Sequence, residues 1–115
     1  MAIYDLEERT FQFAKTVRQF LKELPETQSN IEDIKQLVRS SASVGANYIE
    51  ANEALSKKDF LMRVKISRKE AKESAFFIRL LLETNDKQFE KELEALHKES
   101  VEIKKILSSI IAKSS

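Results

Sequence analysis

The sequence of 115 residues contains no cysteine, one glycine, one proline and one histidine. Without cysteine the chain can form neither disulfides nor thiolate metal sites, which fits a reducing compartment. One glycine and one proline leave little material for hairpins and β-turns, so we expect an all-α fold. The N-terminal sequence lacks the basic start and apolar run of a signal peptide, and no apolar stretch approaches the ~18–20 residues needed to span a bilayer. We therefore expect a cytoplasmic protein without a membrane partner.

The single histidine also limits the metal chemistry open to a helical protein, in particular a di-iron site. Glu94 and His97 have the Glu-x-x-His spacing of di-iron carboxylate sites, but such sites need two of these motifs and two further glutamates. The sequence shows no glycine-rich phosphate loop, no dinucleotide fingerprint and no strained nucleophile turn. Glutamate pairs such as Glu70 and Glu73 are typical of solvated helix faces, although a hydrolase using two carboxylates stays open. We predict a protein that is not an enzyme and has no metal, cofactor or small-molecule substrate.

Almost the whole sequence has the pattern of amphipathic helices. Hydrophobic residues make up 42% of the chain and charged residues 34%, as in an ordinary globular domain. Apolar residues recur every three or four positions in four segments, which predict helices over about 6–24, 30–55, 57–84 and 86–112. Pro25 ends the first, Asn30 is the expected N-cap of the second, and Ser56 caps the third. Short connections favour an antiparallel up-down-up-down four-helix bundle, forming a single domain over residues 1–115.

The only glycine, Gly45, lies in the middle of the second predicted helix, among the small residues of segment 40–46. A glycine there costs about 1 kcal/mol relative to alanine. Such a cost most simply indicates the close approach of another helix. The inner face of this helix is predicted to continue as far as Leu55.

The third predicted helix has more apolar residues than one core stripe can use. A helical projection places five of them on a second side, which we call the apolar face: Met62, Ile66, Phe76, Phe77 and Leu80. Two buried sides on one helix indicate a partner, and a second copy of the chain is the simplest one. The alternative is that this helix lies centrally in its own bundle.

Positive charge is concentrated on the same helix. Segment 57–84 carries eight basic and four acidic residues, whereas the whole chain has a net charge of +1. Five of the bases fall within a sector of about 80°, which we call the basic stripe: Lys58, Lys65, Lys69, Lys72 and Arg79. Such a stripe beside Phe76 could follow the phosphate backbone of RNA or DNA. The alternative is an ordinary solvated lysine face.

Several polar residues lie near these surfaces. Glu73 falls within the apolar face, where an ionised carboxylate needs a partner, and Arg39 and Arg79 are the candidates. Asn47 and Glu50 are expected to form another polar pair on the second helix. For Arg39, Asn47, Glu50 and Glu73 we predict structural hydrogen bonding.

The segments LVRSSASVGANYIEANEALSKKDF and VKISRKEAKESAFFIRLL resemble the four-helix-bundle proteins encoded in ribosomal RNA intervening sequences of bacteria. The residues that carry this resemblance are Arg39, Ser43-Val44-Gly45 with Asn47 and Glu50, Ser56 to Phe60, and Ser67 to Ser74. The opening DLEERTFQFAKTVRQFLKELP is also similar, so the resemblance covers nearly the whole chain. Tyr48 and Ala51-Asn52 depart from the commoner pattern.

This resemblance implies a homo-oligomer, with a pentamer as the expected form. Related proteins are accessory variability proteins of diversity-generating retroelements and look like nucleic-acid binders that act through basic surfaces, although most of the family has no established role. It also implies structural roles for the polar motif of Arg39, Asn47, Glu50 and Glu73. Two hypotheses follow: a nucleic-acid-binding oligomer, or a structural or protein-interaction scaffold that binds no nucleic acid.

Overall fold

The computed structural model describes the backbone of residues 3–115 and the side chains from Asp5 onward. It contains four long helices and one short 3₁₀ helix, with no strand in the described range: α1 (Ile3–Leu21), α2 (Gln28–Asn52), α3 (Lys57–Thr84), η1 (Lys87–Phe89) and α4 (Glu90–Ser114). The prediction of an all-α four-helix bundle is confirmed. Within residues 3–115, no helix is both long and apolar enough to cross a membrane.

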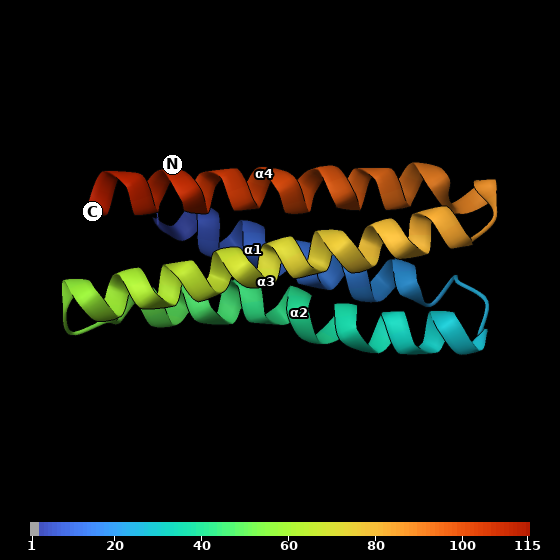
Figure 1. Cartoon of the computed structure of the whole chain (residues 1–115), viewed down its shortest axis with the longest axis horizontal. Coiled ribbons are helices and arrows are strands. Elements are labelled where there is room, and N and C mark those ends of the chain that lie inside the picture. Colours follow the sequence, from blue (N-terminus) through green and yellow to red (C-terminus); the bar gives the residue numbers. More distant parts are fainter. Residues whose placement is uncertain (1–2) are drawn as a thin grey trace.

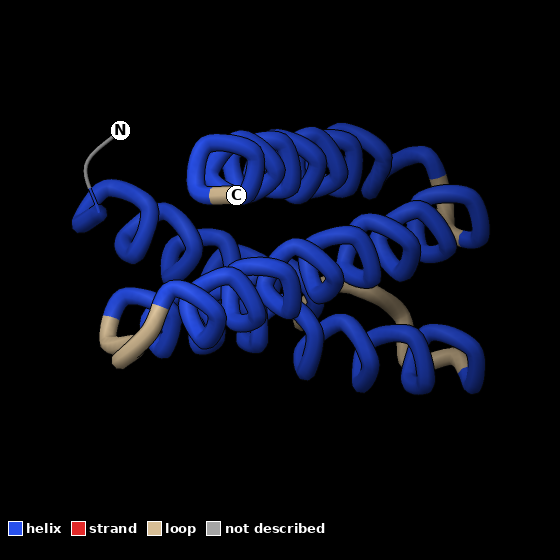
Figure 2. Tube along the Cα trace, turned by 60° about the vertical axis from the view of Figure 1, so that its left-hand side comes forward, coloured by secondary structure: helices blue, strands red, loops and turns tan. Residues whose placement is uncertain are grey.

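The bundle is elongated, with extents of 45 × 22 × 19 Å. In Figure 1 each helix runs back along the one before it, and the connections lie alternately at the two ends. Figure 2 shows, from another side, that the helices cross one another at an angle rather than lying strictly parallel. α2 contacts both α1 and α3, and a short connection joins it to each of these helices.

The core is a single cluster to which all four helices contribute. On α3 the predicted stripe is buried from Val64 through Ser67, Ala71, Ser74 and Ile78 to Leu81, while Phe60 at its start is half-buried. The 3.6-residue period thus placed the inner face of this helix correctly.

The first and second helices end differently from the prediction. α1 stops at Leu21 instead of residue 24, because two short turns follow, in which Glu23 and Leu24 donate to carbonyls three residues back. Leu24 is nevertheless buried. α2 stops at Asn52, and Leu55 is fully exposed rather than part of the inner face. A tight connection to α3 bends the chain outward before Leu55 can reach the core.

Asn30 is not the N-cap of α2. That role belongs to Thr27, whose hydroxyl accepts a hydrogen bond from the Asn30 backbone N–H at 3.2 Å. The Asn30 side chain is buried and donates to the Pro25 carbonyl at 2.9 Å and to Asn85 Oδ1 at 2.7 Å. It therefore ties together two connections at the same end of the bundle.

The remaining boundaries follow local signals. α3 begins after Ser56, whose hydroxyl accepts from the Asp59 N–H at 3.1 Å, as the capping pattern predicted. The predicted fourth helix over 86–112 is divided, because residues 87–89 form η1 before α4 starts at Glu90. Phe89 is half-buried against the core, and its ring meets Phe20 edge-on at 6.3 Å between centroids.

The expected close approach at Gly45 is confirmed. A Cβ atom added there would lie 2.9 Å from Thr10 Oγ1 and 3.2 Å from Thr10 Cβ. Thr10 is completely buried, and its hydroxyl donates to the carbonyls of Leu6 and Glu7, both at 2.9 Å. The glycine therefore allows α1 and α2 to pack closely at this point.

Candidate interaction surfaces

The apolar face of α3 lies largely on the outside of the bundle. Phe76 is 59% exposed and Met62 47% exposed, and Leu80 is exposed as well. Ile66 and Phe77 are half-buried; Phe77 packs against the core and meets the Phe76 ring edge-on at 5.3 Å. Most of this face therefore has no covering side chains within the described chain, whereas Phe77 serves partly as core.

The basic stripe is also on the outside. All five of its residues are exposed. Within residues 3–115, no carboxylate lies in ion-pair distance of Lys58, Lys65, Lys69 or Lys72. Arg79 differs, because its Nε donates to Glu83 Oε2 at 2.8 Å, a hydrogen bond that raises the pKa of Arg79. Four of the five predicted bases are thus available to an external anion.

The two surfaces face different neighbours. Glu73, within the apolar face, bonds to α2, whereas Arg68, beside the basic stripe, donates to Ser108 of α4 at 3.5 Å. Projected at about 100° per residue, the centres of the two surfaces are separated by about 70°. The apolar face therefore looks out between α2 and α3, and the basic stripe looks out between α3 and α4.

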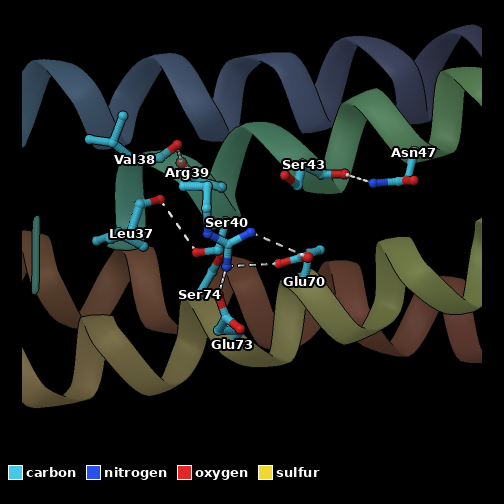
Figure 3. Close-up of polar contacts among 10 residues, drawn as sticks. Leu37, Val38, Arg39, Ser40, Ser43, Asn47, Glu70, Glu73 and Ser74 are labelled. Carbon is cyan, nitrogen blue, oxygen red and sulfur yellow. Dashed lines mark hydrogen bonds and ion pairs between the residues drawn. The ribbon is translucent and has the colours of Figure 1, made fainter. Parts of the chain in front are cut away.

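An ion cluster joins α2 to α3 (Figure 3). Arg39 Nη2 bonds to Glu73 Oε2 and lies 3.3 Å from Glu70 Oε1, while Nη1 donates to Glu70 Oε2 at 3.5 Å. Two cations, Arg39 and Arg79, were predicted as possible partners of Glu73. Arg39 is the partner, and Arg79 is not. The cluster fixes the rotation of α3 relative to α2.

Glu70 was interpreted as part of a solvated face, and this was wrong. It is only 8% exposed, and its Oε1 faces Arg39 without hydrogen-bonding geometry to any described group. A weak signal existed in the sequence, because Glu70 lies one turn from both Ser67 and Ser74 of the predicted core stripe. A single-helix projection places it at the border, and only the position of α2 decides its burial.

Asn47 and Glu50 do not form the expected pair. Asn47 donates to the Ser43 carbonyl at 2.9 Å and accepts from Arg63 of α3 at 3.3 Å, while Glu50 is exposed. Asn47 therefore joins α2 to α3 (Figure 3 shows its bond to Ser43). Glu50 has no such role within the described chain.

Buried hydroxyls complete the contact between α2 and α3. Ser67 donates to the Val44 carbonyl at 2.6 Å, and the hydroxyls of Ser40 and Ser74 lie 2.9 Å apart. Small side chains let the two helices approach closely enough for these bonds. The contact between α2 and α3 thus combines close packing with side-chain hydrogen bonds.

Sequence reasoning missed a second apolar surface, which lies between α1 and α2. One groove, the Phe11 groove, has a volume of about 480 Å³ and is lined mainly by apolar and small side chains: Thr10, Phe11, Ala14, Ala42, Gly45, Ala46 and Ile49. Phe11 is 58% exposed, and Ile49 is exposed as well. The signal in the sequence was the presence of large apolar residues outside the inner stripe of each helix.

A second groove, the Ile31 groove, continues along the same side toward the α1–α2 connection. It has a volume of about 840 Å³ and is lined by Leu21, Leu24, Ile31, Ile34 and Val38 among others. Arg18 borders both grooves and donates to the Val38 carbonyl at 3.1 Å. The α1/α2 side thus carries two apolar depressions, and two cations, Arg18 and Lys22, border both of them.

No cluster of three or more histidine, cysteine or acidic side chains suited to a metal ion occurs in the described part of the chain. His97 is half-buried on α4, and its carbonyl accepts from the Ser100 hydroxyl at 2.7 Å. The surfaces described above are accordingly the strongest functional candidates.

Comparison with known proteins agrees with this architecture. A family model described as 23S rRNA-intervening sequence protein matches residues 4–109. A crystal structure of a protein of unknown function from the S23 ribosomal protein family of Bacteroides thetaiotaomicron VPI-5482 is 32% identical in sequence, with a TM-score of 0.85. The match covers 97% of this chain and 99% of that one. No curated protein matches the chain.

Proposed function

The chain belongs to the family of 23S rRNA-intervening sequence proteins, and we propose that it is a non-catalytic, homo-oligomeric bundle of the cytoplasm that binds RNA or DNA. The basic stripe of α3 would contact the nucleic acid, and the apolar face of α3 would join the copies. A pentamer is the expected form.

The observation that carries the nucleic-acid proposal is the row of four exposed lysines without intramolecular ion pairs. From Lys58 to Arg79 the stripe extends about 30 Å along the helix, at about 1.5 Å per residue. Lysines held free of carboxylates can neutralise phosphates and release their counterions. Since the stripe looks out between α3 and α4, contact of the apolar face with another copy leaves its central lysines, Lys65, Lys69 and Lys72, accessible.

Self-association follows from the large exposed side chains of the apolar face. Phe76, Met62 and Leu80 all lie on α3 and are all exposed. A soluble monomer rarely exposes a contiguous apolar patch of this kind without a partner. A symmetric oligomer would also repeat the basic stripe and add up its field.

The test is a titration of labelled structured RNA and duplex DNA into the protein, after its mass in solution has been measured by light scattering. If Lys65, Lys69 and Lys72 of a copy each neutralise a phosphate, affinity should fall roughly fortyfold between about 50 and 200 mM salt. The charge-reversal variant Lys65→Glu/Lys69→Glu/Lys72→Glu should abolish this salt-sensitive binding.

A matched control reverses three exposed lysines spaced by seven residues on α4: Lys91→Glu/Lys98→Glu/Lys105→Glu. It makes the same change in net charge, so equal losses in both variants would indicate a general charge effect and contradict the stripe as the site. Binding that does not depend on salt would contradict it too.

The alternative is a structural or protein-interaction scaffold. The observation that favours it is the pair of apolar grooves between α1 and α2, since apolar depressions suit protein partners better than phosphates. An oligomer indifferent to both nucleic acids would make this the better account.

A further inference from the structure

We infer that the apolar face of α3 in one copy docks on the α1/α2 side of the next copy, so that Met62 and Ile66 enter the Phe11 groove and Phe76 and Leu80 cover the Ile31 groove. This inference rests on the proposed self-association and adds the surface that receives α3. The contact joins two different patches, so the same interface repeats from copy to copy.

Shape is the first argument. Large side chains projecting from a single helix form a ridge, and the space between two helices with alanine and glycine at their contact forms a hollow. The ridge has two apolar parts, separated by charged residues that include Lys69 and Glu73. The α1/α2 side has two apolar grooves, which meet at two cations, Arg18 and Lys22.

The register between α2 and α3 places the first part of the ridge at the height of the first groove. Arg63 Nη1 donates to Asn47 Oδ1 at 3.3 Å, and Asn47 directly follows Ala46 of the Phe11 groove. Met62 and Ile66 are therefore at the height of this groove in every copy. Copies related by rotation about an axis parallel to the bundle keep that height, so ridge and groove of neighbouring copies meet.

The second apolar part of the ridge also lies at the height of its groove. Asn30 and Asn85 exchange hydrogen bonds of 2.7 and 2.9 Å, which brings the end of α3 beside the start of α2. Phe76 and Leu80 lie just before Asn85, and segment 31–38 of the Ile31 groove lies just after Asn30. Both apolar parts thus match without any shift along the bundle.

At one end of the Phe11 groove, the charges of groove and ridge are opposite in sign. Glu7 borders this groove and accepts from Asn52 at 2.8 Å. Asn52 lies five positions after Asn47 on α2, and the same step back from Arg63 on α3 leads to Lys58. Lys58 of one copy therefore meets Glu7 of its neighbour at the same height, an attraction between opposite charges.

The placement of the two patches favours a ring. The ridge looks out between α2 and α3 and the grooves lie between α1 and α2, so they occupy adjacent sides of the bundle, about 90° apart in a four-helix arrangement. Successive copies joined through adjacent sides turn by about a quarter of a circle and close after about four or five copies. An α3-to-α3 contact would instead stop at a dimer and leave both grooves uncovered.

The absence of cysteine from the natural chain allows a direct test by cross-linking. We would prepare Ile49→Cys and Met62→Cys as single variants, mix them, allow exchange and oxidise them. Covalent dimers are expected from the mixture and none from either variant alone. The double variant Ile49→Cys/Met62→Cys should give a ladder of covalent oligomers. Ser109→Cys, at an exposed position of α4, replaces Ile49→Cys in the control mixture and should give no dimer.

Each outcome has a defined meaning. Dimers from Met62→Cys alone, or equal dimers in the control mixture, would overturn the pairing of α3 with the groove. An oligomer by light scattering without the expected cross-link would also overturn it, while self-association would stand. A species of 13.3 kDa would overturn both. As a second variant, Ile49→Asp places a charge in the groove and should reduce the oligomer to monomers that keep their helical circular dichroism.

Discussion

Replacing Gly45 by alanine tests whether the α1–α2 contact really requires a residue without a side chain. If Gly45 were an ordinary helix position, the substitution should stabilise the protein by about 1 kcal/mol, because alanine is the better helix former. The new Cβ would, however, lie 2.9 Å from Thr10 Oγ1, which is closer than such atoms approach. The two effects have opposite signs.

The steric effect should prevail. Thr10 is completely buried, and its hydroxyl is held by the Leu6 and Glu7 carbonyls, so it cannot simply turn away. Overpacking of a close contact costs about 1–3 kcal/mol. After subtraction of the gain in helix propensity, we expect Gly45→Ala to lower the free energy of unfolding by about 1 kcal/mol.

Urea unfolding followed by circular dichroism, at one fixed protein concentration, measures this loss. In the Thr10→Ala background the 2.9 Å contact disappears and the closest remaining contact is 3.2 Å, so Gly45→Ala should become neutral or stabilising. The coupling energy of the double-mutant cycle should be about 1 kcal/mol.

An exposed alanine of α4, outside both grooves, supplies the control. Ala95→Gly should cost about 1 kcal/mol from helix propensity alone. If Gly45→Ala instead stabilised the protein by the full propensity difference, with no coupling to Thr10, the reasoning from close packing would be refuted.

Arg39→Ala should lower the free energy of unfolding in urea by about 2 kcal/mol, because it leaves the buried Glu70 carboxylate without its cation. Glu70→Gln in that background should recover part of the loss, and no recovery would contradict the argument. Asn30→Ala should cost about 2–3 kcal/mol in the same assay, because the Pro25 carbonyl and the Asn85 amide lose their partner; a loss within error of zero would contradict the buried link. Burial raises the pKa of the Tyr48 phenol, so the folded state keeps its proton at a pH where the unfolded state, with its ordinary pKa of about 10, ionises. The contribution of Tyr48 is therefore fully present below about pH 10 and is lost as the pH rises further; thermal melts between about pH 9 and 11 should show this alkaline decline in the natural chain and less of it in Tyr48→Phe.

The candidate surfaces divide into a part that the sequence predicted and a part that it did not. The apolar face and the basic stripe each belong to one helix, so a projection of residues 57–84 was enough to find both. The partner of Glu73 could be narrowed to Arg39 or Arg79, and only the packing of α2 on α3 selected Arg39. The burial of Glu70 and the grooves between α1 and α2 were missed, because each depends on two helices at once.

The sequence by itself determined the four helices, their inner faces, the cap at Ser56 and the need for close packing at Gly45. These features depend on local backbone preference and on a period of 3.6 residues, both of which are encoded in neighbouring positions. The tertiary structure alone decided that Asn30 is a buried link rather than a cap, and where the grooves between α1 and α2 open. Such features depend on the rotation and height of one helix against another, and a periodic pattern within a single helix carries no information about either.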